Sequence, residues 1–313
     1  MRRLSIRLVM SVVLVFAVTA ISFFFEALIP GNAAGSILGP EATPSEVHRL
    51  SVQLGLDQPA YERYIHWLGG LFGGDLGTSY ATGQPVSSLL PQQLPVTLAI
   101  VVGSTLVAVL LGVGLGVLSA LRPGRLGRFV DALSALGMAL PNFWLALVLV
   151  ELFAVLTPVF PATGYVSPGT SPGLWLRSLV LPVLALGLHT ITLIAQQTSE
   201  QMSETLQQGF VQTLRANGAS HRSIVFRHAL RNAAIPIVTV VGIAFVGLLG
   251  GTVFIERVFS LPGLGSGLTT ATNTHDLPVV QGISLYFILI VIAVNFLTDL
   301  TYTWLNPRAR RAW

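Results

Sequence analysis

The sequence predicts an all-α membrane protein with six transmembrane helices and both termini in the cytoplasm. Its 313 residues are 52% hydrophobic and only 10% charged, whereas soluble domains carry roughly 25% charged residues. Six segments have the roughly 20 mostly apolar residues that are needed to cross a bilayer. Basic residues gather on one side of these segments, and cytoplasmic loops retain such an excess. Together these observations indicate an integral membrane protein.

The six apolar segments define the predicted spans. They cover about Leu8–Leu28, Val96–Leu121, Ala132–Leu156, Leu179–Ala195, Ile235–Ile255 and Val279–Tyr302. A basic start and the small residues GNAAGS at 31–36 also fit a cleaved signal peptide. The first apolar run is longer than a signal core of about 7–15 residues, which favours a retained first span. Glycines at 112, 114 and 116 in the second span predict close helix contact.

The placement of arginine gives the predicted topology. All 17 basic residues are arginine, and thirteen of them lie before span one, between spans two and three, between spans four and five, or after span six. Both termini are therefore expected in the cytoplasm. This topology accounts for the basic charge, so membrane lipid is an expected partner and nucleic acid is not.

Cysteine and lysine are both absent, and this excludes several kinds of chemistry. Without cysteine there is no disulfide, iron–sulfur cluster or thiol nucleophile. Without lysine there is no standard phosphate-binding loop and no Schiff-base chemistry. No Ser–His–Asp set stands out, and His221 and His228 lack the spacing of an HExxH metal site. We expect neither a catalytic residue nor a metal site in this chain.

The segment between the first two spans, residues 30–94, is predicted to be external and partly helical. Thr43 can cap a helix that begins with Pro44, and Gly55 can end that helix. A second helical pattern follows, and its apolar face suits docking on a membrane surface or on another subunit. That face consists of Tyr61, Tyr64, Ile65 and Leu68.

The segment between spans four and five predicts two short helices. Residues 210–217 continue a helical pattern, Gly218 supplies the left-handed residue that ends it, and Ser220 can cap the next helix. One stripe of that next helix is apolar and is expected to lie on the bundle, and the opposite side is expected to meet a soluble partner. The stripe consists of Phe226, Ala229, Leu230 and Ala233, and the opposite side of Arg227, His228 and Arg231.

The order of a helix, Ala-x-Gly, and a second helix ending in an Asn-x-x-x-Pro turn resembles the coupling motif of ATP-binding-cassette importer permeases. Here the motif reads RANG (215–218), HALRN (228–232) and IP (235–236). Further stretches, in order along nearly the whole chain, resemble the dipeptide, oligopeptide and nickel permease subfamily. They are GDLGTS (74–79), GQPV (83–86), LPNFWLAL (140–147), VFSLPGLGS (258–266), LPVVQG (277–282) and NPRAR (306–310). Gln212 and Asn217 depart from the family, whose members commonly carry a basic residue there.

The resemblance implies the permease subunit of an ATP-driven importer of dipeptides or oligopeptides in a bacterial or archaeal cytoplasmic membrane. The implied partners are a second homologous permease, two ATPases that bind ATP and magnesium, and an extracytoplasmic solute-binding protein. No cofactor is implied in this chain, and the absence of lysine fits ATP hydrolysis by partner subunits. The resemblance assigns ATPase coupling to Phe210, Gln212, Thr213, Arg215, Ala216, Asn217, Gly218, Ala219, Ser220, Arg227, His228, Arg231, Asn232 and Pro236. It assigns the external receptor side to Gly74, Asp75, Gly77, Thr78 and Ser79.

The expected organisation has three parts. Residues 1–94 form the first transmembrane helix and the external segment, 95–306 form the transmembrane core with coupling helices at about 202–233, and 307–313 form a cytoplasmic tail. In the core, Glu151 and His189 are candidates for the substrate pathway, because ionisable residues within spans are often functional. An acid that pairs near the outer interface and a satisfied buried histidine are the alternatives.

Other functions stay open at this point. The same architecture could import nickel, an opine-like or other metal chelate, a glycosidic solute or glutathione. An ion-driven secondary transporter would show paired broken helices and acid-rich sites at the membrane midplane, and an intramembrane enzyme would need a catalytic set of residues. Neither pattern is evident in the sequence.

Overall fold

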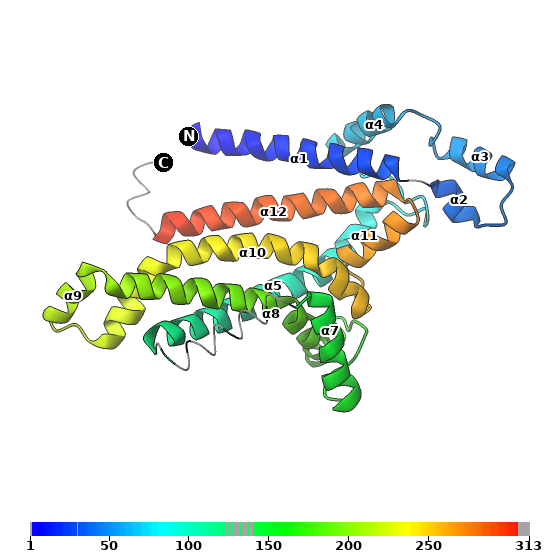
Figure 1. Cartoon of the computed structure of the whole chain (residues 1–313). Helices are drawn as coiled ribbons and strands as arrows, with labels where there is room; N and C mark the ends of the chain where they lie inside the picture. The colour runs from blue at the N-terminus through cyan, green and yellow to red at the C-terminus, as the bar shows by residue number, and fades with distance from the viewer. Residues whose placement is uncertain are drawn as a thin grey trace. The chain divides into compact units, whose positions relative to one another are not determined.

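The computed structural model describes residues 2–29, 31–122, 124, 127, 132, 137 and 140–305. Within these ranges the regular structure is helical, apart from one isolated antiparallel bridge between Thr78 and Pro85. The predicted all-α class is therefore confirmed for the described residues. The helices labelled in Figure 1, together with the π-helical turns η1 and η2, are α1 (Arg2–Leu28), α2 (Ala33–Leu38), α3 (Pro44–Gln53), α4 (Ala60–Phe72), α5 (Val86–Leu121), α7 (Asn142–Val150), η1 (Glu151–Leu156), α8 (Pro172–Gln207), α9 (Gly209–Ala216), η2 (Ser223–Ala229), α10 (Leu230–Val258), α11 (Leu264–Asn273) and α12 (Leu277–Leu305).

Five described helical segments are long and apolar enough to cross a membrane. They are Val9–Glu26, Val86–Leu121, Pro172–Gln207, Ser223–Val258 and Leu277–Leu305. These overlap the predicted first, second, fourth, fifth and sixth spans.

The predicted third span, Ala132–Leu156, is not one continuous helix. Helix α7 begins only after Pro141, whose backbone is extended at φ −64° and ψ 138°. A proline inside a helix removes a hydrogen bond and clashes with the preceding turn, so the helix starts anew after it. The described apolar helix at this position, Asn142–Leu156, is shorter than a span, and much of the predicted first half lies outside the described residues. The count of six spans therefore stays a prediction.

Helices α5 and α8 are longer than the spans predicted for them. Each contains 36 residues. Helix α8 begins at a cap, where Oγ of Ser171 accepts a hydrogen bond from the Leu174 amide (3.4 Å) and Pro172 occupies the first helical position. Hydropathy identifies only the part of a helix that is apolar enough to lie in hydrocarbon. The helix itself continues until a cap or a turn satisfies its terminal backbone groups, so it can be longer than the predicted span.

The chain forms two compact units, one of Met1–Thr97 with Pro262–Ile292 and the other of Leu98–Leu261 with Ala293–Trp313. In the first unit, α12 approaches the start of α5 closely at Gly282, where a Cβ atom would lie 2.6 Å from a methyl group of Val86. Ser22 of α1 and Ser284 of α12 share a hydrogen bond of 3.1 Å, so these helices lie side by side (Figure 1). The buried core includes Leu76, Val86, Leu90, Leu264, Ala271 and Ile283.

Helix α3 begins and ends as the sequence predicts. The Glu46 amide donates to Oγ1 of Thr43 (3.4 Å), and the Thr43 amide donates back to the Glu46 carboxylate (2.9 Å). The hydrogen bond from the Thr43 hydroxyl lowers the pKa of the Glu46 carboxyl. At the other end Gly55 has φ 67°, and the Leu56 amide donates to the Ser51 carbonyl (2.9 Å). The predicted cap at Thr43 and stop at Gly55 are both confirmed.

In the second unit, glycines of α5 allow it to approach α8. A Cβ atom at Gly112 would lie 2.8 Å from Cβ of Ile194, and one at Gly116 would lie 2.5 Å from the Ala195 carbonyl oxygen. Close contact is therefore confirmed at these two glycines. At Gly114 a Cβ atom would meet nothing within 4 Å. The prediction for Gly114 is wrong because residues four apart share a helix face and the residue between them does not.

Candidate functional site

The turn that follows α9 is built around Gly218. Its φ of 78° is in the left-handed region. The Gly218 amide donates to the Arg215 carbonyl and the Ala219 amide to the Leu214 carbonyl, each at 3.0 Å. This pair of hydrogen bonds is a Schellman motif, which satisfies the carbonyl groups at a helix end. The predicted role of Gly218 in ending the helix is confirmed.

The helix after this turn begins at the predicted cap and continues further than predicted. The Ser223 amide donates to Oγ of Ser220 (3.3 Å), which confirms the cap. From His221 the chain stays helical through η2 and α10 to Val258. The predicted turn between Asn232 and Pro236 is therefore wrong. Proline is tolerated within a membrane helix where its surroundings compensate for the lost hydrogen bond, and Pro236 lies inside α10.

The apolar stripe of this helix differs from the predicted one. Ala229 and Ala233 are buried as predicted, but Phe226 is 62% exposed, whereas Ile224 and Val225 are buried. The cause is the π-helical winding of η2, which puts more residues into each turn than an α-helix and rotates the face that a 3.6-residue period assigns. An exposed phenylalanine thus lies next to Arg227.

The remaining residues predicted for ATPase coupling lie around this turn. Figure 1 shows α9 at the end of α8, with the chain returning towards α10. Exposed among the predicted residues are Gln212, Thr213, Arg215, Ala216, Asn217, Gly218, Ser220, Arg227, Arg231 and Asn232. Half-buried are Phe210, Ala219, His228 and Pro236. Met202, Val225 and Ala229 belong to one buried hydrophobic cluster, and Val211 of α9 is also buried. The segment Gly209–Ala229, called here the coupling segment, therefore presents polar, basic and aromatic groups on a packed base.

The five residues predicted for the external receptor side lie in the loop between α4 and α5. Asp75 accepts a hydrogen bond from the Gly77 amide (2.8 Å). The Ser79 amide donates to the Gln84 carbonyl (2.9 Å), and the Val86 amide donates to the Gly77 carbonyl (3.0 Å). These bonds close residues 77–86 into a narrow loop, called here the receptor-side loop. Gly74 and Thr78 are exposed.

Asp276 holds the receptor-side loop in place and was missed by the sequence reasoning. Its carboxylate, in a side chain only 2% exposed, accepts hydrogen bonds from the Ser79 hydroxyl, the Tyr80 amide (3.1 Å) and the Ala81 amide (3.2 Å). Asp276 also precedes α12 and accepts through its carbonyl from the Val279 amide (3.1 Å). An acidic residue before Leu-Pro signals a helix cap, but no local signal indicates a bond to a loop 197 residues away.

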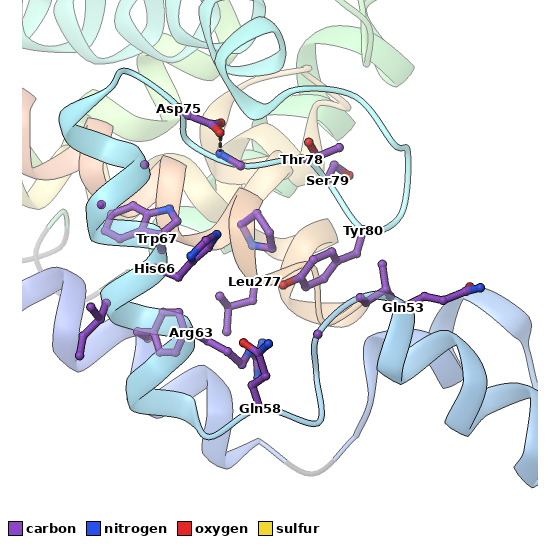
Figure 2. A pocket seen from close by; sticks show the side chains of 18 of the residues that line it. Gln53, Gln58, Arg63, His66, Trp67, Asp75, Thr78, Ser79, Tyr80 and Leu277 are labelled. Atoms are coloured by element: carbon purple, nitrogen blue, oxygen red, sulfur yellow. Dashed lines mark hydrogen bonds between the residues drawn. The ribbon is translucent and has the colours of Figure 1, made fainter.

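A cavity of about 950 Å³ lies between α4 and the receptor-side loop. Figure 2 shows Arg63, His66 and Trp67 of α4 on one side, with Thr78 and Tyr80 of the loop across from them. A neighbouring cavity of about 200 Å³ is lined by Glu26, Arg63 and His275 among others. In it, Nδ1 of His275 lies 4.0 Å from Oε1 of Glu26. The first unit therefore contains a hollow, lined by both apolar and polar side chains, that the loop and α4 border together.

The structure does not join the two residues predicted for the substrate pathway. Glu151 is exposed at the start of η1, and His189 is half-buried in α8. Among the described residues no hydrogen bond or ion pair connects their side chains. In the same residues, no three histidine, aspartate or glutamate side chains gather as they would around a metal ion.

The chain is similar to known membrane transport proteins. Residues 112–311 match the family described as binding-protein-dependent transport system inner membrane component, and residues 1–101 match the N-terminal family of such membrane components. A putative peptide transport system permease protein of Brucella abortus is 40% identical over 305 residues, covering 97% of each chain. The oligopeptide transport system permease protein AppB of Bacillus subtilis is 31% identical over 306 residues, covering 96% of this chain and 97% of that protein.

A further relative and a solved structure extend these comparisons. The probable D,D-dipeptide transport system permease protein DdpB of Escherichia coli is 35% identical over 322 residues, covering 96% of this chain and 95% of that protein. A structure of the MetNI methionine ABC transporter in an inward-facing conformation has a TM-score of 0.58 and 21% identity, and covers 70% of this chain and 96% of that chain. At this identity the structural likeness supports the fold.

Proposed function

The chain belongs to the family of binding-protein-dependent transport system inner membrane components, and we propose that it is the peptide-translocating permease subunit of an ATP-driven importer. It is a multi-pass protein of a bacterial inner membrane. The partners that we propose are a second homologous permease, two ATPases and an extracytoplasmic solute-binding protein. ATP and magnesium bind to the ATPases, and this chain carries no cofactor of its own.

The observation that carries the proposal is the coupling segment. It is rigidly built, with a Schellman turn, a serine cap and a buried base, yet its outer face is exposed and includes Phe226 beside Arg227. Exposed aromatic and arginine side chains are enriched where proteins bind one another. Arginines that served only to orient the membrane helices would not require this ordered turn.

Helix continuity supplies the mechanism that we propose for coupling. Gln208 alone separates α8 from α9, and the second half of the coupling segment continues without a break into α10. A displacement of the coupling segment by closing ATPases would therefore act directly on two long apolar helices. Rigid-body movement of packed helices is an established means of switching between conformations. In this proposal both termini and the coupling segment are cytoplasmic, and the chain has six spans.

We place the solute-binding protein on the receptor-side loop. The loop is ordered by its own main-chain bonds and by Asp276, while Thr78 in the loop and Asp75 just before it are exposed. An ordered loop with exposed polar groups loses little conformational entropy when a partner binds. The adjoining cavity gives a protruding part of such a partner room to enter.

Peptides are the proposed cargo because the matched permeases of Brucella abortus and Bacillus subtilis are named for peptide and oligopeptide transport. Nickel, metal chelates and glutathione remain alternatives within the same architecture. The test is uptake of a labelled peptide into vesicles that hold the assembled importer. Uptake that requires ATP and continues after ion gradients are collapsed supports the proposal. Uptake that stops when the ion gradient is collapsed and does not depend on ATP supports an ion-driven secondary transporter instead.

Phe226→Ala should weaken ATPase binding without disturbing the fold. Phe226 is 62% exposed, so its removal creates little cavity, and an aromatic anchor in an interface contributes roughly 2 kcal/mol or more. We expect a reduction of at least about tenfold in ATPase affinity, measured by titration of the ATPases onto the purified permease pair. Phe254→Ala is the matched control, because Phe254 is also 62% exposed but lies near the other end of α10. Equal losses at both positions would contradict a local docking role.

Glu151→Gln should alter the selectivity of uptake for charge. If the exposed Glu151 carboxylate faces the pathway, its loss removes attraction for cationic cargo and has little effect on neutral cargo. The expected result is a lower ratio of cationic to neutral peptide uptake, measured with peptides of the same length. Glu200→Gln, which changes another exposed acid, should leave the ratio unchanged. An unchanged ratio in the Glu151 variant would exclude the pathway role.

A further inference from the structure

Helix α4 carries an apolar stripe that is mostly exposed among the described residues. Tyr61, Ile65 and Phe72 are 56%, 63% and 81% exposed, and Leu68 is half-buried. Positions four, seven and eleven residues apart lie on one face of an α-helix. Glu62, in contrast, is exposed on the polar side of the same helix. We call Tyr61, Ile65, Leu68 and Phe72 the α4 stripe; contiguous apolar surface of this kind marks a site of contact with protein or membrane.

The depth of α4 is defined by Tyr64. Its hydroxyl donates to the main-chain carbonyl of Phe16 (3.2 Å) and lies 3.0 Å from Oγ1 of Thr19. Both partners belong to the apolar stretch Val9–Glu26 of α1. At about 1.5 Å per residue, Thr19 lies roughly 10 Å along the helix axis from the end of this stretch. A hydrocarbon core is about 30 Å thick, so a bilayer crossed by this apolar stretch would contain the Tyr64 hydroxyl.

Aromatic contacts hold α4 against the same part of α1. The rings of Tyr64 and Phe23 pack edge to face with centroids 5.3 Å apart, and Tyr64 stacks on Trp67 at 6.2 Å. The Arg63 guanidinium lies 5.8 Å from the Phe23 ring centre. An arginine placed this way can keep its stem on apolar groups and direct its charge towards the headgroups.

We propose that α4 lies within the membrane leaflet at the C-terminal end of α1 and that the α4 stripe contacts lipid acyl chains. The α4 stripe is apolar and exposed, as is the surface of α1, where Ile21 and Phe25 are 56% and 66% exposed. The large cavity is lined by Arg63, His66 and Trp67 of α4 and also by Ile65 of the stripe. This arrangement is that of an interfacial amphipathic helix. The inference requires only that α1 crosses the membrane, and it depends neither on the cargo nor on the ATPases.

Single cysteines can locate the α4 stripe, because the chain has none of its own. Ile65→Cys and Glu62→Cys each introduce one thiol, on the stripe and on the polar side of the same helix. Each full-length variant, with the subunits that co-purify, is labelled with a nitrobenzoxadiazole maleimide and placed in nanodiscs of phosphatidylcholine brominated on its acyl chains. At residue 65 the proposal expects blue-shifted emission and several-fold stronger quenching by bromine than at residue 62. Iodide in the water should quench the label at residue 62 more strongly than the label at residue 65.

Two results would overturn the proposal. Red emission at residue 65 with strong quenching by iodide would place the stripe in water. Blue-shifted emission that brominated lipid does not quench would place it under protein, as a second permease would do. Phe72→Cys repeats the measurement at the other end of the stripe and must agree with Ile65→Cys. Both side chains are exposed, so an unchanged thermal unfolding temperature of each variant is expected and shows that the label reports on the native fold.

Discussion

Gly218→Val is expected to reduce ATPase co-purification about tenfold or more and to abolish ATP-driven uptake. The left-handed backbone of Gly218, at φ 78°, costs an L-residue roughly 1–2 kcal/mol, and a β-branched residue is among the least tolerant. A Cβ atom at this position would meet nothing within 4 Å, so the effect comes from the backbone angle and not from a clash. The Schellman turn must distort, which moves Phe226 and Arg227 relative to α9.

Two control variants separate this explanation from a general effect of size. Gly218→Asn should retain most co-purification, because asparagine adopts the left-handed conformation at helix ends more readily than other residues. Gly209→Val places the same side chain at the start of α9, where the glycine has no positive φ and its Cβ would also meet open space. It should have little effect. Full ATPase binding by Gly218→Val would contradict the role assigned to this turn.

Asp276→Ala is expected to release the receptor-side loop and to lower uptake that depends on the solute-binding protein to a small fraction. The substitution removes the acceptor for the Ser79 hydroxyl and for the amides of Tyr80 and Ala81. Each buried donor left without a partner costs about 1–3 kcal/mol, and the Ser79 side chain is buried. The amides of Tyr80 and Ala81 are only partly buried, so the loss comes mainly from Ser79 and is about 1–3 kcal/mol. Hydrogen exchange of residues 79–81 should rise along with the loss of uptake.

Asp75→Asn provides the matched comparison for Asp276. Asp75 is exposed and accepts one hydrogen bond, from the Gly77 amide (2.8 Å), and the asparagine side-chain oxygen can accept the same bond. Its effect on loop exchange and uptake should be small. If Asp276→Ala left hydrogen exchange of the loop unchanged, the carboxylate would not be what holds the loop.

Local signals in the sequence were enough to predict several features of the fold. Thr43 and Gly55 start and end α3, and Ser220 and Gly218 form the turn of the coupling segment, as expected from side-chain capping and left-handed glycine. These features depend on residues within a few positions of one another. Composition likewise sufficed for the all-α class, because a chain this apolar must satisfy its backbone within helices to cross a membrane.

Other features depend on contacts or windings that no short stretch of sequence reveals. Asp276 and Ser79 are 197 residues apart, and only the packing of α12 against the start of α5 brings their loops together. Phe226 is exposed because η2 is wound as a π-helix, whereas the stripe was assigned with an α-helical period. Helix α7 begins only after Pro141, and the apolar composition of the predicted third span does not reveal this start.

Purification of this chain from native membranes tests the central claim most directly, because an importer permease cannot work without its ATPases. A mild detergent extract of tagged full-length chain would be isolated and its associated proteins identified and counted. The account predicts a second homologous permease and two ATP-binding subunits, with a solute-binding protein retained when peptide is present. The account would be contradicted if the chain purified only with copies of itself. It would also have to give the same set of associated proteins with and without the Gly218→Val substitution.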